Sequence, residues 1–293
     1  MDAETVGLAQ ALKHPNVTLR TAARVVRLVA TGGRITAVEL ENGENLSAPL
    51  IVLSAGAVMS SVLLLGSADA AHPRGLANRS DQVGRNFMNH NISAILALHP
   101  FRKNAMIYQK TLMLNDFYLT GGPGGAPLGN MQLLGKISGP ILASDTPIPL
   151  TIANWIARRS VDMIAMSEDL PDPDSRVTLR GGQIVLDWKR SNWAAHLALV
   201  ARLKQVLRRA GYPILLARAF DRRTPSHQCG TARMGADPAT SVVDAFCRSH
   251  DHPNLFITDA SVLPTSAAVN PALTIAALAL RTARHILEQE FAA

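Results

Sequence analysis

Two long uncharged stretches, at 45–68 and 260–280, constrain the fold of this chain more than any other feature. Each has about the 20 residues that a bilayer-spanning helix needs. However, Pro49 and Gly56 interrupt the first stretch, and Pro271 interrupts the second together with another proline. This pattern favours a short buried strand, a tight turn and then a helix, which is typical of a strand covered on both faces. We therefore expect an α/β fold without a membrane span.

The composition indicates a globular protein with a sizeable core. Hydrophobic residues make up 47% of the 293 residues and charged residues 17%, a balance that argues against disorder. The net charge of +7 comes from scattered basic residues and only 4% of the chain is aromatic, so we expect no nucleic-acid partner.

The cysteines and histidines indicate neither a disulfide framework nor a metal site. Cys229 and Cys247 cannot form a disulfide scaffold. His250 and His252 lack further clustered ligands, so we expect no metal site.

The pattern changes twice along the chain. β-rich residues from 17 to 46, with a two-residue turn at Gly32-Gly33, predict a β-meander, and the apolar run 50–56 predicts a buried strand that leads into a helix. A strand, a small-residue turn and a helix N-terminus can place backbone N–H groups near a phosphate, although many α/β proteins contain such a unit. Residues 254–260 predict a second buried strand, followed by a loop and a helix after Pro271.

The middle of the chain, from about residue 87 to 224, has a different pattern of residues. It predicts a hairpin around Gly181-Gly182 and an amphipathic helix over 194–211 that ends at Gly211. We expect these elements to form a separate α+β layer with its own sheet. The first and last pieces of the chain would then form one domain around this insertion.

Two polar residues are candidates for chemistry. His227 lies among small and polar residues, and Asn270 stands before Pro271 at the start of the last predicted helix. A histidine near neutral pKa can take a proton from a hydroxyl, and an amide can hold the oxygen in place. From spacing alone, the simpler interpretation is that His227 hydrogen-bonds a loop and Asn270 caps the helix. Cys229 could contact His227, but nothing in the sequence would activate its thiol.

Several segments, in order and over essentially the whole chain, resemble the glucose–methanol–choline (GMC) oxidoreductase family. They are ARVVRL, IVLSAGAVMSSVLLL, VGRNFMNH, SEDLPDPDSRVTL, HQCGTARMGADPATSVVD and NLFITDASVLPTSAAVNPALTIAALALR. Members of this family are FAD enzymes that oxidise alcohols or sugars, with a base that removes the hydroxyl proton while the carbinol carbon gives hydride to the flavin. The resemblance implies an α/β protein: a Rossmann-like FAD-binding domain, made of 1–86 and 225–293, with an inserted antiparallel-sheet substrate-binding domain at 87–224.

The resemblance also implies roles for single residues. His227 matches the histidine of the family's His-x-x-Gly-Thr segment, the proposed base. Asn270 matches the second active-site position, which is Asn or His in the family and would orient the substrate oxygen. The residues that would contact FAD are Val25 and Ala55 beside the adenosine, Asp259 and Ala260 beside the ribityl and pyrophosphate, and Pro271 and Ala272 beside the flavin ring.

Two departures from the family pattern bear on these expectations. Family members begin with a strand, Gly-x-Gly-x-x-Gly and a helix, none of which is found in this sequence, so we expect a truncated FAD-binding domain. The alternative to an active enzyme is a catalytically incompetent fragment, or one half of a split flavoenzyme completed by a separate N-terminal polypeptide. Asn89 also stands where many relatives have Asp in the Asn-x-x-Asp-His motif.

The expected cellular location rests only on the pattern of the first residues. The first 16 residues contain no basic segment followed by an apolar run, so they do not form a signal peptide. We therefore expect the cytoplasm, although an export signal could lie in the N-terminal region that the family pattern expects.

Overall fold

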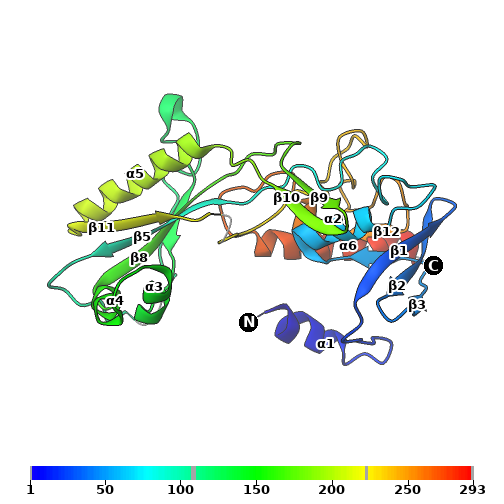
Figure 1. Cartoon of the computed structure of the whole chain (residues 1–293), viewed down its shortest axis with the longest axis horizontal. Coiled ribbons are helices and arrows are strands. Elements are labelled where there is room, and N and C mark those ends of the chain that lie inside the picture. Colours follow the sequence, from blue (N-terminus) through cyan, green and yellow to red (C-terminus); the bar gives the residue numbers. More distant parts are fainter. Residues whose placement is uncertain (1, 107–109, 222–223, 292–293) are drawn as a thin grey trace.

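The computed structural model of this protein describes residues 2–106, 110–221 and 224–291. Its elements form two lobes that lie side by side along the long axis (Figure 1). The first lobe contains both ends of the chain, and the second lobe is built from its middle. Within the described residues, no helix is both long and apolar enough to cross a membrane.

The first lobe contains two small sheets and two main helices. An antiparallel sheet is formed by β1 (Val25–Thr31), β2 (Arg34–Leu40) and β3 (Asn45–Leu46), and a parallel pair by β4 (Ile51–Leu53) and β12 (Leu255–Ile257). The helical elements are η1 (Glu4–Leu8), α1 (Ala9–Ala11), α2 (Gly56–Gly66), η3 (Ala260–Val262) and α6 (Ala272–Glu290). The predicted turn at Gly32-Gly33 is confirmed, because both glycines adopt positive φ between β1 and β2. The predicted strand, turn and helix at 50–66 are also confirmed.

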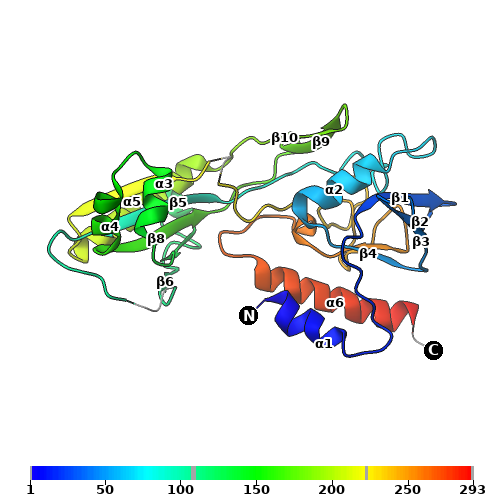
Figure 2. The ribbon, with the colours of Figure 1, turned by 60° about the horizontal axis from the view of Figure 1, so that its bottom comes forward.

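Apolar side chains from distant parts of the chain form the core of this lobe. Leu28, Leu53, Leu64 and Leu255 belong to one buried cluster, so β1, β4, α2 and β12 pack together. Helix α6 is much less covered: Thr282 is its only buried side chain. Three of its leucines, Leu273, Leu280 and Leu287, are 86%, 73% and 64% exposed. Figure 2 shows α6 lying along the lower edge of the lobe.

The second lobe is organised by a five-stranded antiparallel sheet. Its strand order is β11-β5-β8-β7-β6. The strands are β5 (Asn91–Leu98), β6 (Met113–Leu114), β7 (Asn130–Leu133), β8 (Ser160–Ser167) and β11 (Ile214–Ala219). Helix α5 (Trp193–Arg209) covers one face of this sheet, and the helices α3 (Gly139–Asp145) and α4 (Leu150–Ala157) lie on the other side (Figure 1). The short turn η2 (Pro123–Gly125) connects β6 and β7. The predicted amphipathic helix is α5, and Gly211 follows its end with φ of +88°.

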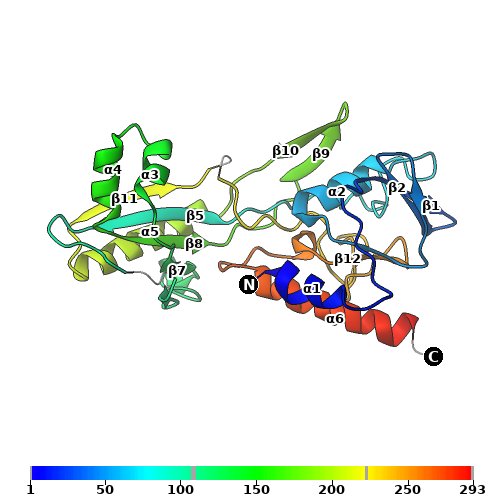
Figure 3. The same cartoon turned by 90° about the horizontal axis from the view of Figure 1, so that it is seen from below.

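The predicted hairpin is present as β9 (Arg176–Arg180) and β10 (Gln183–Asp187), but it does not join the five-stranded sheet. It packs on α2, where Val177 belongs to a cluster with Val58 and Val62 (Figure 3). The packing therefore places residues 176–187 with the first lobe, which differs from the expected grouping of 87–224. The reason is that the apolar side of β9 faces α2, which supplies a surface for it.

A junction segment, residues 226–234, runs between the two lobes and is hydrogen-bonded along both sides. Cys229 exchanges two backbone hydrogen bonds with Met88, each 3.0 Å long. On the other side, the N–H groups of Gly230, Ala232 and Met234 donate to carbonyl groups of η3 over 2.8–3.2 Å. The segment is thus fixed between the chain that enters β5 and the chain that follows β12.

Acid should destabilise the protein through His196 of α5. This side chain is fully buried, with Nε2 2.8 Å from Ser93 Oγ and Nδ1 3.1 Å from Ser167 Oγ. Burial lowers the pKa of His196 to about 4, from an ordinary value of 6.5. Because the unfolded chain binds this proton more readily, the stability contributed by neutral His196 is complete above pH 6.5 and is lost as the pH falls toward 4.

We expect this residue to lower the free energy of unfolding by about 1 kcal/mol per pH unit between about pH 6 and 4.5. Urea denaturation over a pH series measures the slope. The variant His196→Gln, which does not titrate, should show a shallower dependence, and His14→Gln at an exposed position is the matched control. Equal slopes for wild type and His196→Gln would contradict the assignment.

Gly230 in the junction segment should not tolerate a side chain. Its φ is +92°, and an added Cβ would lie 2.3 Å from the Asn86 carbonyl oxygen. Gly230→Ala should therefore lose about 3 kcal/mol of unfolding free energy, from backbone strain and steric overlap together. Gly43→Ala is the control, because Gly43 has φ of +84° with nothing within 4 Å, and should lose only about 1 kcal/mol. Chemical denaturation of both variants measures the difference, and equal losses would refute the close approach.

Candidate active site

The two residues proposed for chemistry meet in the structure. Asn270 Nδ2 lies 3.2 Å from His227 Nε2, although 43 residues separate them. His227 is half-buried in the junction segment and adopts a left-handed backbone conformation with φ of +58°. Such a conformation is uncommon for a residue with a side chain and often marks a functional site. Asn270 is exposed and precedes Pro271, the residue from which α6 starts.

A second histidine, His90, stands behind His227. The two Nδ1 atoms are 2.9 Å apart, and the rings meet edge to face at 70°. The other nitrogen of His90, Nε2, lies 2.6 Å from the carbonyl oxygen of Ser266. Burial lowers the pKa of His90 to about 4, and burial together with the charge of Lys110 lowers the pKa of His227. Both rings are therefore neutral near pH 7.

The amide of Asn270 is held from the other side by Gln132. Gln132 Nε2 donates to Asn270 Oδ1 over 2.7 Å. Gln132 is buried on β7, so this bond connects the start of α6 in the first lobe to the sheet of the second lobe. With its oxygen engaged by Gln132, Asn270 presents its N–H groups toward His227.

Asn89, which stands where many relatives have Asp, fixes the segment that leads into His227. Its Oδ1 accepts from the backbone N–H of Ser226 over 2.7 Å, and its own N–H donates to Asp169 Oδ2 over 3.0 Å. The buried amide thus joins the start of β5 to the junction segment, one residue before His227.

Asp259 holds a second group of predicted residues in place. Its carboxylate accepts from the backbone N–H of Gly56 over 3.0 Å, from the hydroxyl of Ser60, and from the N–H of Ser261 over 2.7 Å. It therefore satisfies donors at the N-terminus of α2 and at the start of η3. Ala260 lies in the same turn, and its carbonyl accepts from the N–H of Gly230 in the junction segment.

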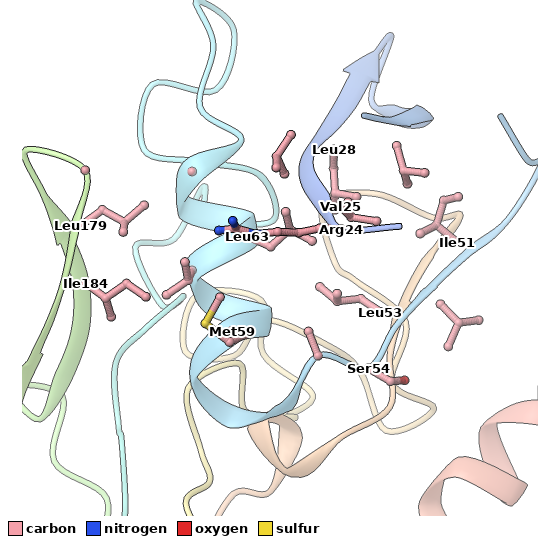
Figure 4. Close-up of a pocket in the computed structure, with 17 residues that line it drawn as sticks. Arg24, Val25, Leu28, Ile51, Leu53, Ser54, Met59, Leu63, Leu179 and Ile184 are labelled. Atoms are coloured by element: carbon pink, nitrogen blue, oxygen red, sulfur yellow. The ribbon is translucent and has the colours of Figure 1, made fainter. Parts of the chain in front are cut away.

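Val25 and Ala55 line one cavity of about 590 Å³ in the first lobe. Its other walls come from β4, α2 and the hairpin, and most of its lining is aliphatic (Figure 4). The figure shows Val25 and Leu28 on one side, Leu179 and Ile184 on the opposite side, and Met59 between them. His227 and Asn270 are not part of this cavity. Pro271 and Ala272 lie apart from it at the first turn of α6, which no side chain caps.

A second cavity, of about 770 Å³, lies between the five-stranded sheet and the helices α3 and α4. Its walls are mainly apolar and include Ala94, Leu96 and Leu134. Ala94 is paired in register with Ile164, which is paired in turn with Gln132. Residues paired across strands point to the same face, so this cavity opens on the sheet face that carries Gln132.

Sequence reasoning missed three residues of this arrangement: His90, Gln132 and Ser266. His90 belongs to the quoted VGRNFMNH segment, which was the available signal, whereas Gln132 lies on a four-residue strand without a marked pattern. Cys229 is buried, and burial raises its pKa to about 12, so it stays a thiol. Across the described part of the chain, no group of three or more His, Cys, Asp or Glu side chains is arranged to hold a metal ion.

Comparisons with known proteins extend over most of the chain. Two family models described as GMC oxidoreductase match residues 1–92 and 171–279. Paromamine 6'-oxidase of Streptomyces fradiae is 30% identical over 312 residues, covering 97% of this chain and 55% of the relative. The fructose dehydrogenase large subunit of Gluconobacter japonicus is 30% identical over 281 residues, covering 87% of this chain and 51% of the relative. The chain thus spans about half the length of the curated relatives it matches.

Solved structures show the same fold. Pyridoxine 4-oxidase from Mesorbium loti matches with a TM-score of 0.70 at 24% identity, covering 99% of this chain and 62% of that chain. Formate oxidase of Aspergillus oryzae RIB40 matches with a TM-score of 0.64 at 16% identity, covering 94% of this chain and 61% of that chain. With both family models matched and the fold shared, this chain belongs to the GMC oxidoreductase family.

Proposed function

We propose that this chain forms the substrate-binding and C-terminal parts of an FAD-dependent oxidoreductase that oxidises the CH–OH group of an alcohol or sugar. The observation that carries the proposal is the convergence of His227 and Asn270, with Nε2 and Nδ2 3.2 Å apart, at the uncapped start of α6. A substrate hydroxyl that replaces this contact can give its proton toward His227 Nε2 while its oxygen accepts from the Asn270 amide.

His227 is the base in this proposal. Because burial and Lys110 lower its pKa, the imidazole is neutral near pH 7 and Nε2 can accept the hydroxyl proton of the substrate. Asn270, whose oxygen is occupied by Gln132, donates an N–H to the substrate oxygen and fixes the direction in which the proton leaves. The rate should therefore fall only when the pH drops through a value below the ordinary histidine pKa of 6.5.

The residues present suit FAD at three places. The aliphatic cavity that includes Val25 and Ala55 suits a flat adenine ring, and Asp259 with Ala260 lies between this cavity and the junction segment. Pro271 and Ala272 stand at the N-terminus of α6, where free N–H groups and the helix dipole favour negative charge. When bound, FAD supplies the acceptor for the hydride that leaves the carbinol carbon.

The substrate would lie on the sheet face that carries Gln132. One relative is named for paromamine and another for fructose, which supports an alcohol or sugar as the substrate class. The apolar cavity between the sheet and α3–α4 opens on this face and would hold the carbon body of the substrate. Its CH–OH group would then reach His227 and Asn270 and replace the contact between them.

Replacing the base tests the proposal. In the complete flavoprotein, His227→Ala should slow flavin reduction by about 10²- to 10⁴-fold, because no other group accepts the hydroxyl proton at that point. Anaerobic stopped-flow absorbance with an alcohol that reduces the wild-type enzyme measures this rate. His14→Ala, at an exposed position outside the site, is the matched control and should keep the wild-type rate. Wild-type reduction by His227→Ala would remove His227 from the mechanism.

A second candidate function is that the chain is one half of a split flavoenzyme, or is catalytically incompetent alone. The free edge of β4 favours this candidate. Strand β4 pairs with β12 on one edge, and no strand of the described residues pairs with its other edge. Val52 of β4 is 49% exposed, although strands of parallel sheets are normally buried. We propose that a further polypeptide segment, carrying the phosphate-binding turn, pairs with this edge and completes the flavin site.

Flavin binding by the 293-residue chain tests whether a further segment is needed. If a further segment is needed, the purified chain mixed with FAD and then desalted should show almost no flavin bands in its visible spectrum. Addition of that segment should restore them. Flavin bound near one equivalent by the chain alone would contradict the second candidate and would favour a cofactor site made by the described residues.

A further inference from the structure

We propose that His90 is a positioning residue: it bridges the Ser266 carbonyl and His227, and thereby fixes the tautomer of His227 with its proton-accepting lone pair at Nε2. The inference rests on the proposed role of His227 as the base. The new residues are His90 and Ser266, which neither the spacing of the motifs nor the comparisons assign to the reaction.

The first step is the hydrogen bond between His90 and Ser266. A carbonyl oxygen can only accept, so His90 Nε2, at 2.6 Å from it, must carry a hydrogen. Both residues are about 2% exposed, so water cannot replace this bond. Burial keeps the His90 ring neutral, with a pKa of about 4, and a neutral imidazole has a single N–H. The lone pair of His90 therefore lies at Nδ1.

The second step follows from the contact between the two rings. His90 Nδ1 and His227 Nδ1 are 2.9 Å apart, a distance that requires one of them to donate. Because His90 Nδ1 holds a lone pair, His227 Nδ1 carries the hydrogen. Ser226 Oγ also approaches this nitrogen, but at the longer distance of 3.4 Å. Neutral His227 therefore has its lone pair at Nε2, the atom that faces Asn270.

The same chain of bonds continues through the amide. Gln132 donates to Asn270 Oδ1, so Asn270 Nδ2 faces His227 Nε2 as a donor. A donor opposite a lone pair is a favourable contact, whereas a hydrogen on Nε2 would oppose the N–H of Asn270. The hydrogen bond from Ser266 through His90 and the hydrogen bond from Gln132 through Asn270 therefore favour the same tautomer of His227.

His90 also suits the protonated form of the base. After Nε2 of His227 has accepted a proton, Nδ1 still carries its hydrogen and still donates to His90 Nδ1. The bonds from Ser266 through His90 to His227 Nδ1 do not have to break or reverse during proton transfer, whereas the contact between Asn270 Nδ2 and Nε2 has to open. The acceptor at His90 therefore supports both states of His227 without moving.

Nitrogen-15 NMR tests the tautomers directly and does not depend on catalysis. In protein labelled with ¹⁵N-histidine, long-range ¹H–¹⁵N correlation near pH 7.5 distinguishes a protonated ring nitrogen from one with a lone pair. His227→Ala and His90→Gln identify the two residues among the nine histidines. We expect the Nδ1–H form for His227 and the Nε2–H form for His90. The Nε2–H form for His227 in the wild-type protein would overturn the proposal.

Two variants of His90 add a matched comparison. His90→Gln keeps an acceptor for His227 and a donor for Ser266, so it should preserve the Nδ1–H form of His227. His90→Leu removes both, so that only the Asn270 contact still opposes the Nε2–H form of His227; this form should then appear beside the Nδ1–H form, and His90→Gln should not show it. An unchanged tautomer in His90→Leu would refute the role of His90. If His90→Leu does not fold, the tautomers of His227 and His90 in the wild-type spectrum still test the proposal.

Kinetics separate this inference from the proposed function. In the complete flavoprotein, His90→Leu should lower kcat for flavin reduction at least tenfold with little change in KM, and His90→Gln should restore most of it. If the tautomers are as expected but His227→Ala reduces flavin at the wild-type rate, the positioning by His90 stands and the proposed base is wrong. If His227→Ala is slow but the tautomers are reversed, the base stands and the role of His90 is wrong.

Discussion

The arrangement of the site depends on the backbone hydrogen bonds of the junction segment. Residues 226–234 pair with the chain near Met88 on one side and with η3 on the other. These two pairings bring three distant parts of the sequence into one place: His227 from the junction segment, His90 from the start of β5, and Asp259 from the end of β12. Gly230 permits the close approach, since an added Cβ would meet the Asn86 carbonyl oxygen at 2.3 Å. Without this backbone contact, the two lobes would have no fixed site between them.

Local patterns in the sequence predicted the elements whose packing is local. The Gly32-Gly33 turn, the buried strand at 51–53 and the end of α5 before Gly211 all follow from short-range signals and are present in the structure. The hairpin at 176–187 was also predicted, but its packing on α2 was not. Hydrophobic alternation identifies an apolar face of a hairpin, whereas the surface that covers this face comes from a helix more than 100 residues earlier in the chain.

The site was only partly predictable for the same reason. Spacing alone left His227 and Asn270 with structural roles, and the family resemblance was needed to bring them together. Gln132 could not be found, because its strand is four residues long and its contact with Asn270 spans 138 residues. His90 was visible within a motif, but its importance depends on the side-chain geometry at Ser266 and His227. The roles of Val25, Ala55, Asp259, Ala260, Pro271 and Ala272 toward FAD stay predictions.

Helix α6 has a consequence that reaches beyond its own packing. Asn270 precedes its first turn, while Leu280 at its middle and Leu287 near its far end are exposed, and a helix of 19 residues is a rigid rod about 28 Å long. A polypeptide that covers these leucines would therefore set the tilt of the rod and, with it, the placement of the Asn270 amide. Assembly at a remote surface and alignment of the reacting groups would then be mechanically linked by a single helix.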